Sequence, residues 1–269
     1  MVSEDVGSGD LTSLFTPNKK IQCTIKCKQT GYISGIPELQ ILFDMYSIKC
    51  WPQFADGDKV KIGDIAFKLT GPAHDLMMVE RIALNILSRM SGITTHTVKY
   101  VKILKKVGSN AQVTATRKTT PLLRYFEKRA VVVGGGLTHR MGLYDMVMIK
   151  DNHLKLFAGD IKKALSAAHG SIKKHAIEVE AATTADAVNA AVGGADVVML
   201  DNMSPEKVEK TLKALEAKGV RDDIVVEVSG GITIDNLSDY AVFDVDWISV
   251  GQLTHSPEAL DFSMYVVEA

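Results

Sequence analysis

The sequence is poor in cysteine, has no long apolar run and carries almost no net charge. Its three cysteines, Cys23, Cys27 and Cys50, form neither an even disulfide framework nor a metal-ligand spacing, which predicts a reducing, cytoplasmic environment. No apolar run approaches the ~20 residues of a membrane span, and the acidic start, MVSEDVGSGD, is unlike a signal peptide. The net charge of −1 provides no global basic field. We therefore expect neither a membrane nor a nucleic acid as a partner.

The first hundred or so residues predict a domain that mixes strands and helices. Residues 21–28 alternate apolar and polar side chains, which predicts a half-buried strand of an antiparallel sheet, with 32–36 as its neighbour. Apolar residues at helical spacing run through 73–90, and we expect Gly92 to end this helix before a second one follows. A domain boundary is placed at 107–110.

Beyond that boundary, a strand, loop and helix pattern repeats. Six short segments rich in β-branched residues predict parallel strands covered by apolar packing on both faces: 112–115, 146–149, 176–179, 197–200, 224–228 and 247–250. The expected helices between them are 161–168, 184–192, 205–218 and 234–240. Six such units predict an α/β barrel or a doubly wound sheet. No low-complexity segment or short internal repeat is present.

Charged residues, hydroxyls or glycines follow the end of each predicted strand. They are Arg117 and Lys118, Lys150, Glu180, Asp201, Ser229-Gly230-Gly231 and Gly251. Because the C-terminal ends of parallel strands open on one face, we expect these residues to converge there. His139 and Arg140, which follow a glycine turn at 134–136, add to the cationic groups. The pattern predicts a pocket for an anion with several charges, such as phosphates plus carboxylates.

Each part of this pocket also has a simpler interpretation. Arg117 and Lys118 could lie in solvent, although they precede 119–121, which reads as a helix start with free amides. Glu180 and Asp201 could be helix N-caps rather than groups that serve magnesium, ribose hydroxyls or a developing positive charge. Residues 229–231 resemble a phosphate-binding nest that opens a helix.

Three functions remain open from the residues alone. Magnesium, a sugar phosphate and a polyanionic partner together favour phosphoribosyl transfer. A Schiff-base aldolase would use Lys150 as nucleophile and Glu180 as the acid–base group. A non-catalytic anion-binding protein would use the same pocket without turnover. No nucleophilic cysteine and no Ser-His-Asp order is evident.

Several motifs together resemble the quinolinate phosphoribosyltransferase family over nearly the whole chain. They are TRKTTP, GGGLTHRMGLYDMVMIKDNH, EVE followed by MLDN, and SGGIT followed by ISVGQLTHS. The resemblance implies transfer of phosphoribosyl from phosphoribosyl pyrophosphate to quinolinate, with decarboxylation and with Mg²⁺. It also implies an N-terminal α/β sandwich (1–108, with 254–269 packing back on it) and an incomplete, open α/β barrel of about six parallel strands (109–253).

The resemblance also assigns roles to individual residues. Catalytic roles would belong to Lys118, Lys150, Glu180 and Asp201, of which the two acids would also serve the metal and the ribose. Arg117, His139, Arg140 and Lys150 would face quinolinate, while Ser229, Gly230 and Gly251 would hold the 5-phosphate. Arg81 would reach the partner subunit's site in a homodimer or hexamer. A sister phosphoribosyltransferase that acts on another base is the nearest alternative.

Overall fold

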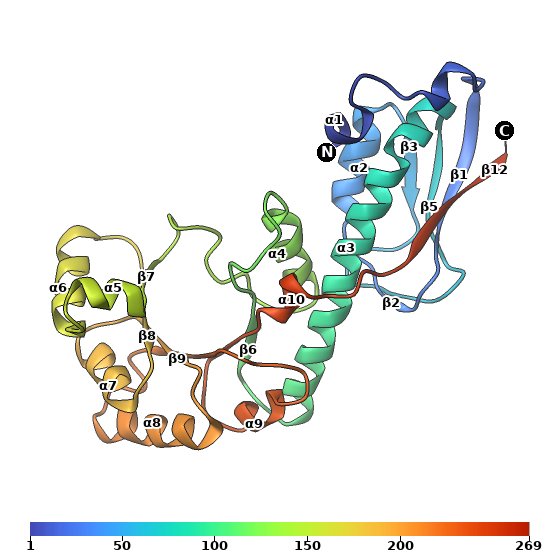
Figure 1. The fold of residues 1–269 in the computed structure, drawn as a ribbon. Coiled ribbons are helices and arrows are strands. Elements are labelled where there is room, and N and C mark those ends of the chain that lie inside the picture. Colours follow the sequence, from blue (N-terminus) through green and yellow to red (C-terminus); the bar gives the residue numbers. More distant parts are fainter. Residues whose placement is uncertain (269) are drawn as a thin grey trace. The chain divides into compact units, whose positions relative to one another are not determined.

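The computed structural model describes residues 1–268 and separates into two compact units (Figure 1). The N-terminal unit contains 1–98, 125–134 and 256–268, and the C-terminal unit contains 99–124 and 135–255. Residues 125–134 belong to the first unit because Glu127 there accepts from Arg89 Nη2 at 2.7 Å, and the Ala130 carbonyl accepts from Thr94 at 2.8 Å. Ala269, the last residue of the expected packing segment, lies outside the described residues.

The N-terminal unit is built on a four-stranded antiparallel sheet of order β12-β1-β5-β3. The strands are Phe262–Glu268, Lys20–Cys27, Ile65–Pro72 and Lys49–Pro52. A two-stranded sheet pairs β2 (Gly31–Tyr32) with β4 (Lys59–Val60), and the helical segments are α1 (Val2–Val6), η1 (Thr12–Leu14), α2 (Ile36–Met45) and the start of α3 (Ala73–Lys106). Ile21, Cys23, Ile25 and Cys27 are all buried, as the alternation predicts.

Two expectations for this unit are wrong. Strand β1 pairs with β5 and β12 rather than with 32–36, because Gly31–Tyr32 pairs with β4 and Ile36 already begins α2. Gly92 does not end a helix, since α3 is a continuous helix of 34 residues. A Cβ at Gly92 would lie 2.0 Å from the Glu258 carbonyl oxygen, so this glycine permits a close approach of the chain rather than a break.

The C-terminal unit contains a six-stranded parallel sheet of order β6-β11-β10-β9-β8-β7. The strands are Gln112–Thr114, Trp247–Ser249, Val225–Ser229, Val197–Asp201, Ile177–Ala181 and Val147–Ile149. The two edge strands, β6 and β7, are consecutive in the chain, and no pairing closes the sheet between them in the part that the structure describes. This arrangement confirms the predicted open α/β barrel and all six of its strands.

Helices cover one face of this sheet, and α6, α7, α8 and α9 follow one another across it from strand to strand (Figure 1). The helices of the unit are α5 (Asp151–Leu156), α6 (Ile161–Ser171), α7 (Thr184–Val192), α8 (Pro205–Ala217), α9 (Leu237–Ala241) and α10 (Gln252–His255). Helix α4 (Arg124–Val133) belongs to the N-terminal unit from Tyr125 on. Helices α6 to α9 lie within the predicted segments or differ from them by a few residues at the ends. Among residues 1–268, no helix has the length and apolar character needed to cross a membrane.

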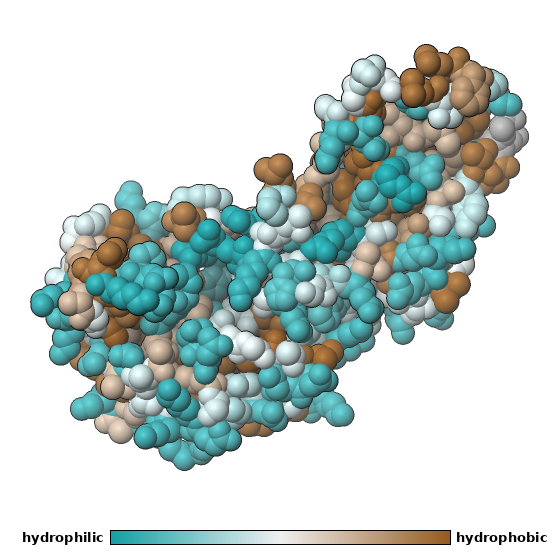
Figure 2. All heavy atoms as spheres, in the orientation of Figure 1, coloured by the Kyte–Doolittle hydropathy of each residue, from teal (hydrophilic) through white to brown (hydrophobic). Residues whose placement is uncertain are grey.

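The two faces of the parallel sheet differ in chemistry. Val179, Val198 and Val226, which face the helices, are fully buried. Because side chains alternate along a strand, the intervening residues point to the other face, and many of them are polar: Glu178, Glu180, Asp201, Glu227, Ser229, Ser249 and Thr114. The expected apolar cover on both faces is therefore wrong for the inner face. In the view of Figure 2, hydrophilic residues also predominate on the surface of this unit.

Candidate active site

A cavity of about 500 Å³ opens at the C-terminal ends of the parallel strands. It brings together nine of the residues predicted from the sequence: Arg117, Lys118, His139, Arg140, Lys150, Glu180, Asp201, Ser229 and Gly230. Seven of them come from the ends of five different strands or the loops beyond them, as the rule for parallel sheets predicts, while His139 and Arg140 come from the loop between α4 and β7. The convergence of cations and acids in one concave site is the arrangement expected of a pocket for an anionic substrate.

The cations of the cavity lie close enough to influence one another. Arg140 is only 7% exposed; its Nη1 donates to the Met146 carbonyl at 3.2 Å, and its Nη2 lies 3.1 Å from Met148 Sδ. Burial and the nearby charge of Arg117 lower the pKa of the Arg140 guanidinium. Two like charges held together in this way favour the binding of an anion between them. The helix start expected at 119–121 is wrong, because α4 begins only at Arg124.

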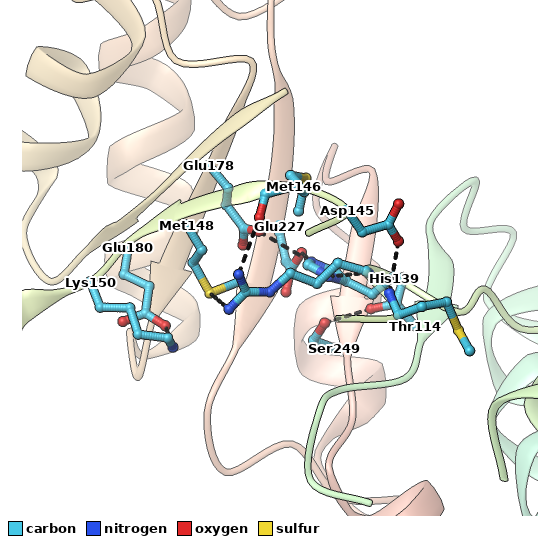
Figure 3. Close-up of polar contacts among 12 residues, drawn as sticks. Thr114, His139, Asp145, Met146, Met148, Lys150, Glu178, Glu180, Glu227 and Ser249 are labelled. Atoms are coloured by element: carbon cyan, nitrogen blue, oxygen red, sulfur yellow. Dashed lines mark hydrogen bonds and ion pairs between the residues drawn. The ribbon is translucent and has the colours of Figure 1, made fainter. Parts of the chain in front are cut away.

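Glu180 and Asp201 face the cavity from adjacent strands. Lys150 Nζ forms an ion pair with Glu180, which Figure 3 shows beside it. Asp201 accepts a hydrogen bond from Asn202 Nδ2 at 3.0 Å. Neither acid is a helix N-cap: the hydroxyls of Thr183 and Ser204 cap α7 and α8.

A smaller cavity of about 160 Å³ adjoins the first one. Its lining includes Lys118, Ser229, Gly230, Gly231, Gly251, Gln252 and His255. Gly230 has a φ of +97°, and a Cβ there would lie 2.3 Å from Asn202 Oδ1, so only glycine fits. The loop does not open a helix as expected, because α9 begins at Leu237. Any anion held here would be bound by loop amides and side chains rather than by a helix end.

Two buried acids were missed at the level of sequence, one of which, Glu227, also lines the cavity. Glu178 and Glu227 are fully buried, and both approach the ring of His139 (Figure 3). His139 Nε2 lies 2.9 Å from Glu227 Oε2 and 3.3 Å from Glu178 Oε2. The signal was present in the segments IEVEA and VVEVS, where strict alternation puts Glu178 on the same face as Glu180 and Glu227 on the same face as Ser229.

This cluster holds protons rather than a metal. Burial lowers the pKa of His139, but hydrogen bonds and charges from Glu178 and Glu227 outweigh it and raise the pKa to about 9. For the Glu178 carboxyl, burial has the opposite effect and raises the pKa. The ligand atoms of the three residues lie within 4.8 Å of one another, as a metal site would require. However, His139 Nδ1 accepts from the Arg140 amide at 2.8 Å, so Nε2 carries the only ring proton and is not available to a metal. The further proton that the cluster keeps up to about pH 9 then lies on the buried carboxylates of Glu178 and Glu227.

Arg81 and Gly251 lie outside the larger cavity. Gly251 lines the smaller one, whereas Arg81 is an exposed residue of α3 in the N-terminal unit and lines neither.

Family models match both parts of the chain. The N-terminal domain of quinolinate phosphoribosyl transferase matches residues 10–91, and the C-terminal domain matches 93–265. Together they cover most of the sequence.

Individual proteins agree with this assignment. A probable nicotinate-nucleotide pyrophosphorylase (carboxylating) from Archaeoglobus fulgidus is 42% identical over 97% of this chain and 99% of its own. The nicotinate-nucleotide pyrophosphorylase (carboxylating) of Homo sapiens is 39% identical over 97% and 87%. The crystal structure of NadC from Streptococcus pyogenes superimposes with a TM-score of 0.90, at 36% identity over 100% of this chain and 94% of that one. The chain therefore belongs to the quinolinate phosphoribosyl transferase family.

Proposed function

We propose that this protein transfers phosphoribosyl from phosphoribosyl pyrophosphate to quinolinate, with decarboxylation, to give nicotinate mononucleotide, pyrophosphate and carbon dioxide. The observation that carries the proposal is the single cavity that joins Arg117, Arg140 and Lys150 to a pair of acids and a glycine loop. Its cations match a dicarboxylate, and its loop matches a terminal phosphate. The relatives bear the name of an enzyme with this activity.

The cationic side chains form the quinolinate side of the pocket in this proposal. Arginine recognises a carboxylate through two parallel hydrogen bonds, which suits Arg117 and Arg140, while Lys118 and Lys150 add point charges. His139 completes the wall beside Arg140. On the opposite side, Ser229, Gly230 and Gly251 would hold the 5-phosphate in the smaller cavity.

Mg²⁺ is part of the proposal, with Glu180 and Asp201 as its residues. Both present carboxylate oxygens, which Mg²⁺ prefers, and they stand on adjacent strands. Asp201 keeps acceptor capacity beyond its bond from Asn202, whereas Glu180 must give up part of its contact with Lys150. A bound magnesium ion would supply charge neutralisation for the leaving pyrophosphate.

The side chains of the pocket account for the chemistry. Departure of pyrophosphate leaves positive character on the ribose, and the carboxylates of Glu180 and Asp201 stabilise it. The pyridine nitrogen of quinolinate forms the new bond to the anomeric carbon while Arg117 and Arg140 hold the carboxylates in place. The ring nitrogen is then cationic. When the bond to the adjacent carboxylate breaks, carbon dioxide leaves, the electron pair stays on the ring carbon, and a proton takes the vacated position.

The active form is proposed to be a cytoplasmic homodimer or hexamer. Arg81, which is exposed on α3, would contribute to the site of the partner subunit. The three cysteines are free, which supports a reducing compartment.

The test is release of carbon dioxide from quinolinate in the presence of phosphoribosyl pyrophosphate and Mg²⁺. Nicotinate and other bases serve as controls, with pyrophosphate as the common product. Pyrophosphate release with another base but not with quinolinate would favour the sister transferase. Borohydride trapping of a carbonyl substrate on Lys150 would favour the aldolase, although an ion pair with Glu180 engages the nitrogen that would have to attack. Tight anion binding without turnover would indicate a binding protein.

A further inference from the structure

His139 and Arg140 form a thin wall between two cavities. Both residues line the substrate cavity, and both also line a second cavity of about 300 Å³ on their other side. The second cavity lies at the open edge of the barrel, and its other walls include Leu137, Met146 and Trp247. Packing is therefore incomplete behind the wall, and it does not by itself keep Arg140 pointed toward the substrate.

The backbone of the wall is also held in an uncommon conformation. His139 has a φ of +50°, in the left-handed region that residues other than glycine seldom adopt. Such a conformation persists only where surrounding contacts enforce it. The side chain of His139 makes contacts that can do so.

Polar contacts of the His139 ring support this backbone conformation. Nε2 donates to Glu227 at 2.9 Å and lies 3.3 Å from Glu178, both on rigid inner strands, and the Trp247 ring meets the imidazole edge-on at 5.7 Å between centroids. On its other nitrogen, the imidazole accepts the backbone N–H of Arg140 at 2.8 Å. The ring thus joins the sheet floor to the backbone from which the Arg140 side chain extends.

We propose that Glu227, assisted by Glu178, is a positioning residue for Arg140. The carboxylate anchors the His139 ring, the ring fixes the left-handed turn, and the turn directs the guanidinium into the quinolinate pocket. The role requires a hydrogen-bond acceptor at the end of residue 227, rather than contact with substrate. This inference rests on the proposed function for its kinetic test but not for its spectroscopic one.

The kinetic test compares Glu227→Leu with Glu227→Gln. Leucine removes the acceptor at 2.9 Å and leaves the N–H only the more distant Glu178 oxygen at 3.3 Å, and the expected result is about a 10- to 100-fold rise in KM for quinolinate. Glutamine keeps an acceptor oxygen, and the expected rise is within about threefold. KM for phosphoribosyl pyrophosphate stays unchanged in both. Thr211→Val, which removes a buried hydrogen bond in α8 and lines none of the three cavities, is the control for a general loss of stability and keeps both KM values.

Three kinetic results would overturn the proposal: equal damage from leucine and glutamine, a parallel rise in both KM values, or no change. Nitrogen-15 spectra of the histidine rings in the wild-type protein give a second test that needs neither turnover nor a variant at residue 227. The His139 resonances are assigned by their loss in His139→Gln. A proton on Nε2 supports the anchor, and an Nε2 without a proton refutes it. If quinolinate is not a substrate, the spectrum still decides the anchoring, so the two failures are distinguishable.

Discussion

Stability should fall between pH 6.5 and 9 because of the buried cluster of His139, Glu178 and Glu227. The folded state raises the pKa of His139 from 6.5 to about 9, because hydrogen bonds to the two acids outweigh the effect of burial. A group whose pKa is raised on folding contributes its full stabilisation when the pH is below the pKa that the group has in the unfolded chain. That contribution is then lost as the pH rises through the folded value.

The size of the effect follows from the two pKa values. The rise from 6.5 to about 9 corresponds to about 3 kcal/mol of the free energy of unfolding. The ring is only 5% exposed, so solvent screens this contribution little. Because the three groups interact, the proton is lost by the cluster as a whole, whichever of its members releases it. Burial also raises the pKa of Cys23 and Cys27 to about 11, from the ordinary value of 9.0. Ionisation of these thiols therefore lowers the stability of the protein only from about pH 9 upward.

The assay is urea unfolding of the wild-type protein and His139→Gln at pH 6.5 and pH 9. Groups elsewhere titrate equally in both proteins, so the difference in unfolding free energy isolates the cluster. The wild type should be the more stable by a margin that shrinks by about 3 kcal/mol over this range. Parallel curves for the two proteins would refute the assignment of an extra proton to the folded cluster.

Three further predictions concern single positions. Gly230→Ala should raise KM for phosphoribosyl pyrophosphate at least about tenfold in steady-state kinetics, because its Cβ would meet Asn202 at 2.3 Å and its φ of +97° is strained; an unchanged KM would remove this loop from the phosphate site. Gly92→Ala should destabilise the N-terminal unit by about 1–3 kcal/mol in urea unfolding, because the added carbon would overlap the Glu258 carbonyl, and a neutral result would contradict the close approach. Mixing inactive Arg81→Ala and Arg117→Ala proteins should restore about a quarter of wild-type activity, if Arg81 acts in the partner's site and subunits mix at random, because half of the dimers are then mixed and each has one complete site of two. Mixtures that stay inactive would argue against a shared site.

The positions of the parallel strands and of the residues after them were predictable from the sequence. Runs such as DVVML have no helical period and are too short for a buried helix, so strands were the consistent interpretation. Once the strands are placed, the rule for their C-terminal ends brings Glu180, Asp201 and Ser229 together without any tertiary information.

Features that depend on contacts distant in sequence were not predictable. Gly92 reads locally as a helix breaker, and only the Glu258 segment, far along the chain, explains a glycine inside α3. The partners of β1 are likewise set by β5 and by β12 at the end of the chain, which no local pattern identifies. Local propensity is a weak guide where such contacts decide.

The two acids that the sequence analysis missed could have been found from the alternation of side chains along their strands. Each of Glu178 and Glu227 stands two positions before a residue that reaches the cavity, Glu180 and Ser229, so each pair occupies one face of its strand. The residue nearer the strand end faces the open part of the cavity, while the one before it is fully buried. A buried acid is costly unless it is paired or protonated, so its presence indicates a partner inside the barrel. In this chain the partner is His139, which lies in the loop between α4 and β7. The same alternation that supplies the site with acids therefore also supplies the floor that holds its arginine in place.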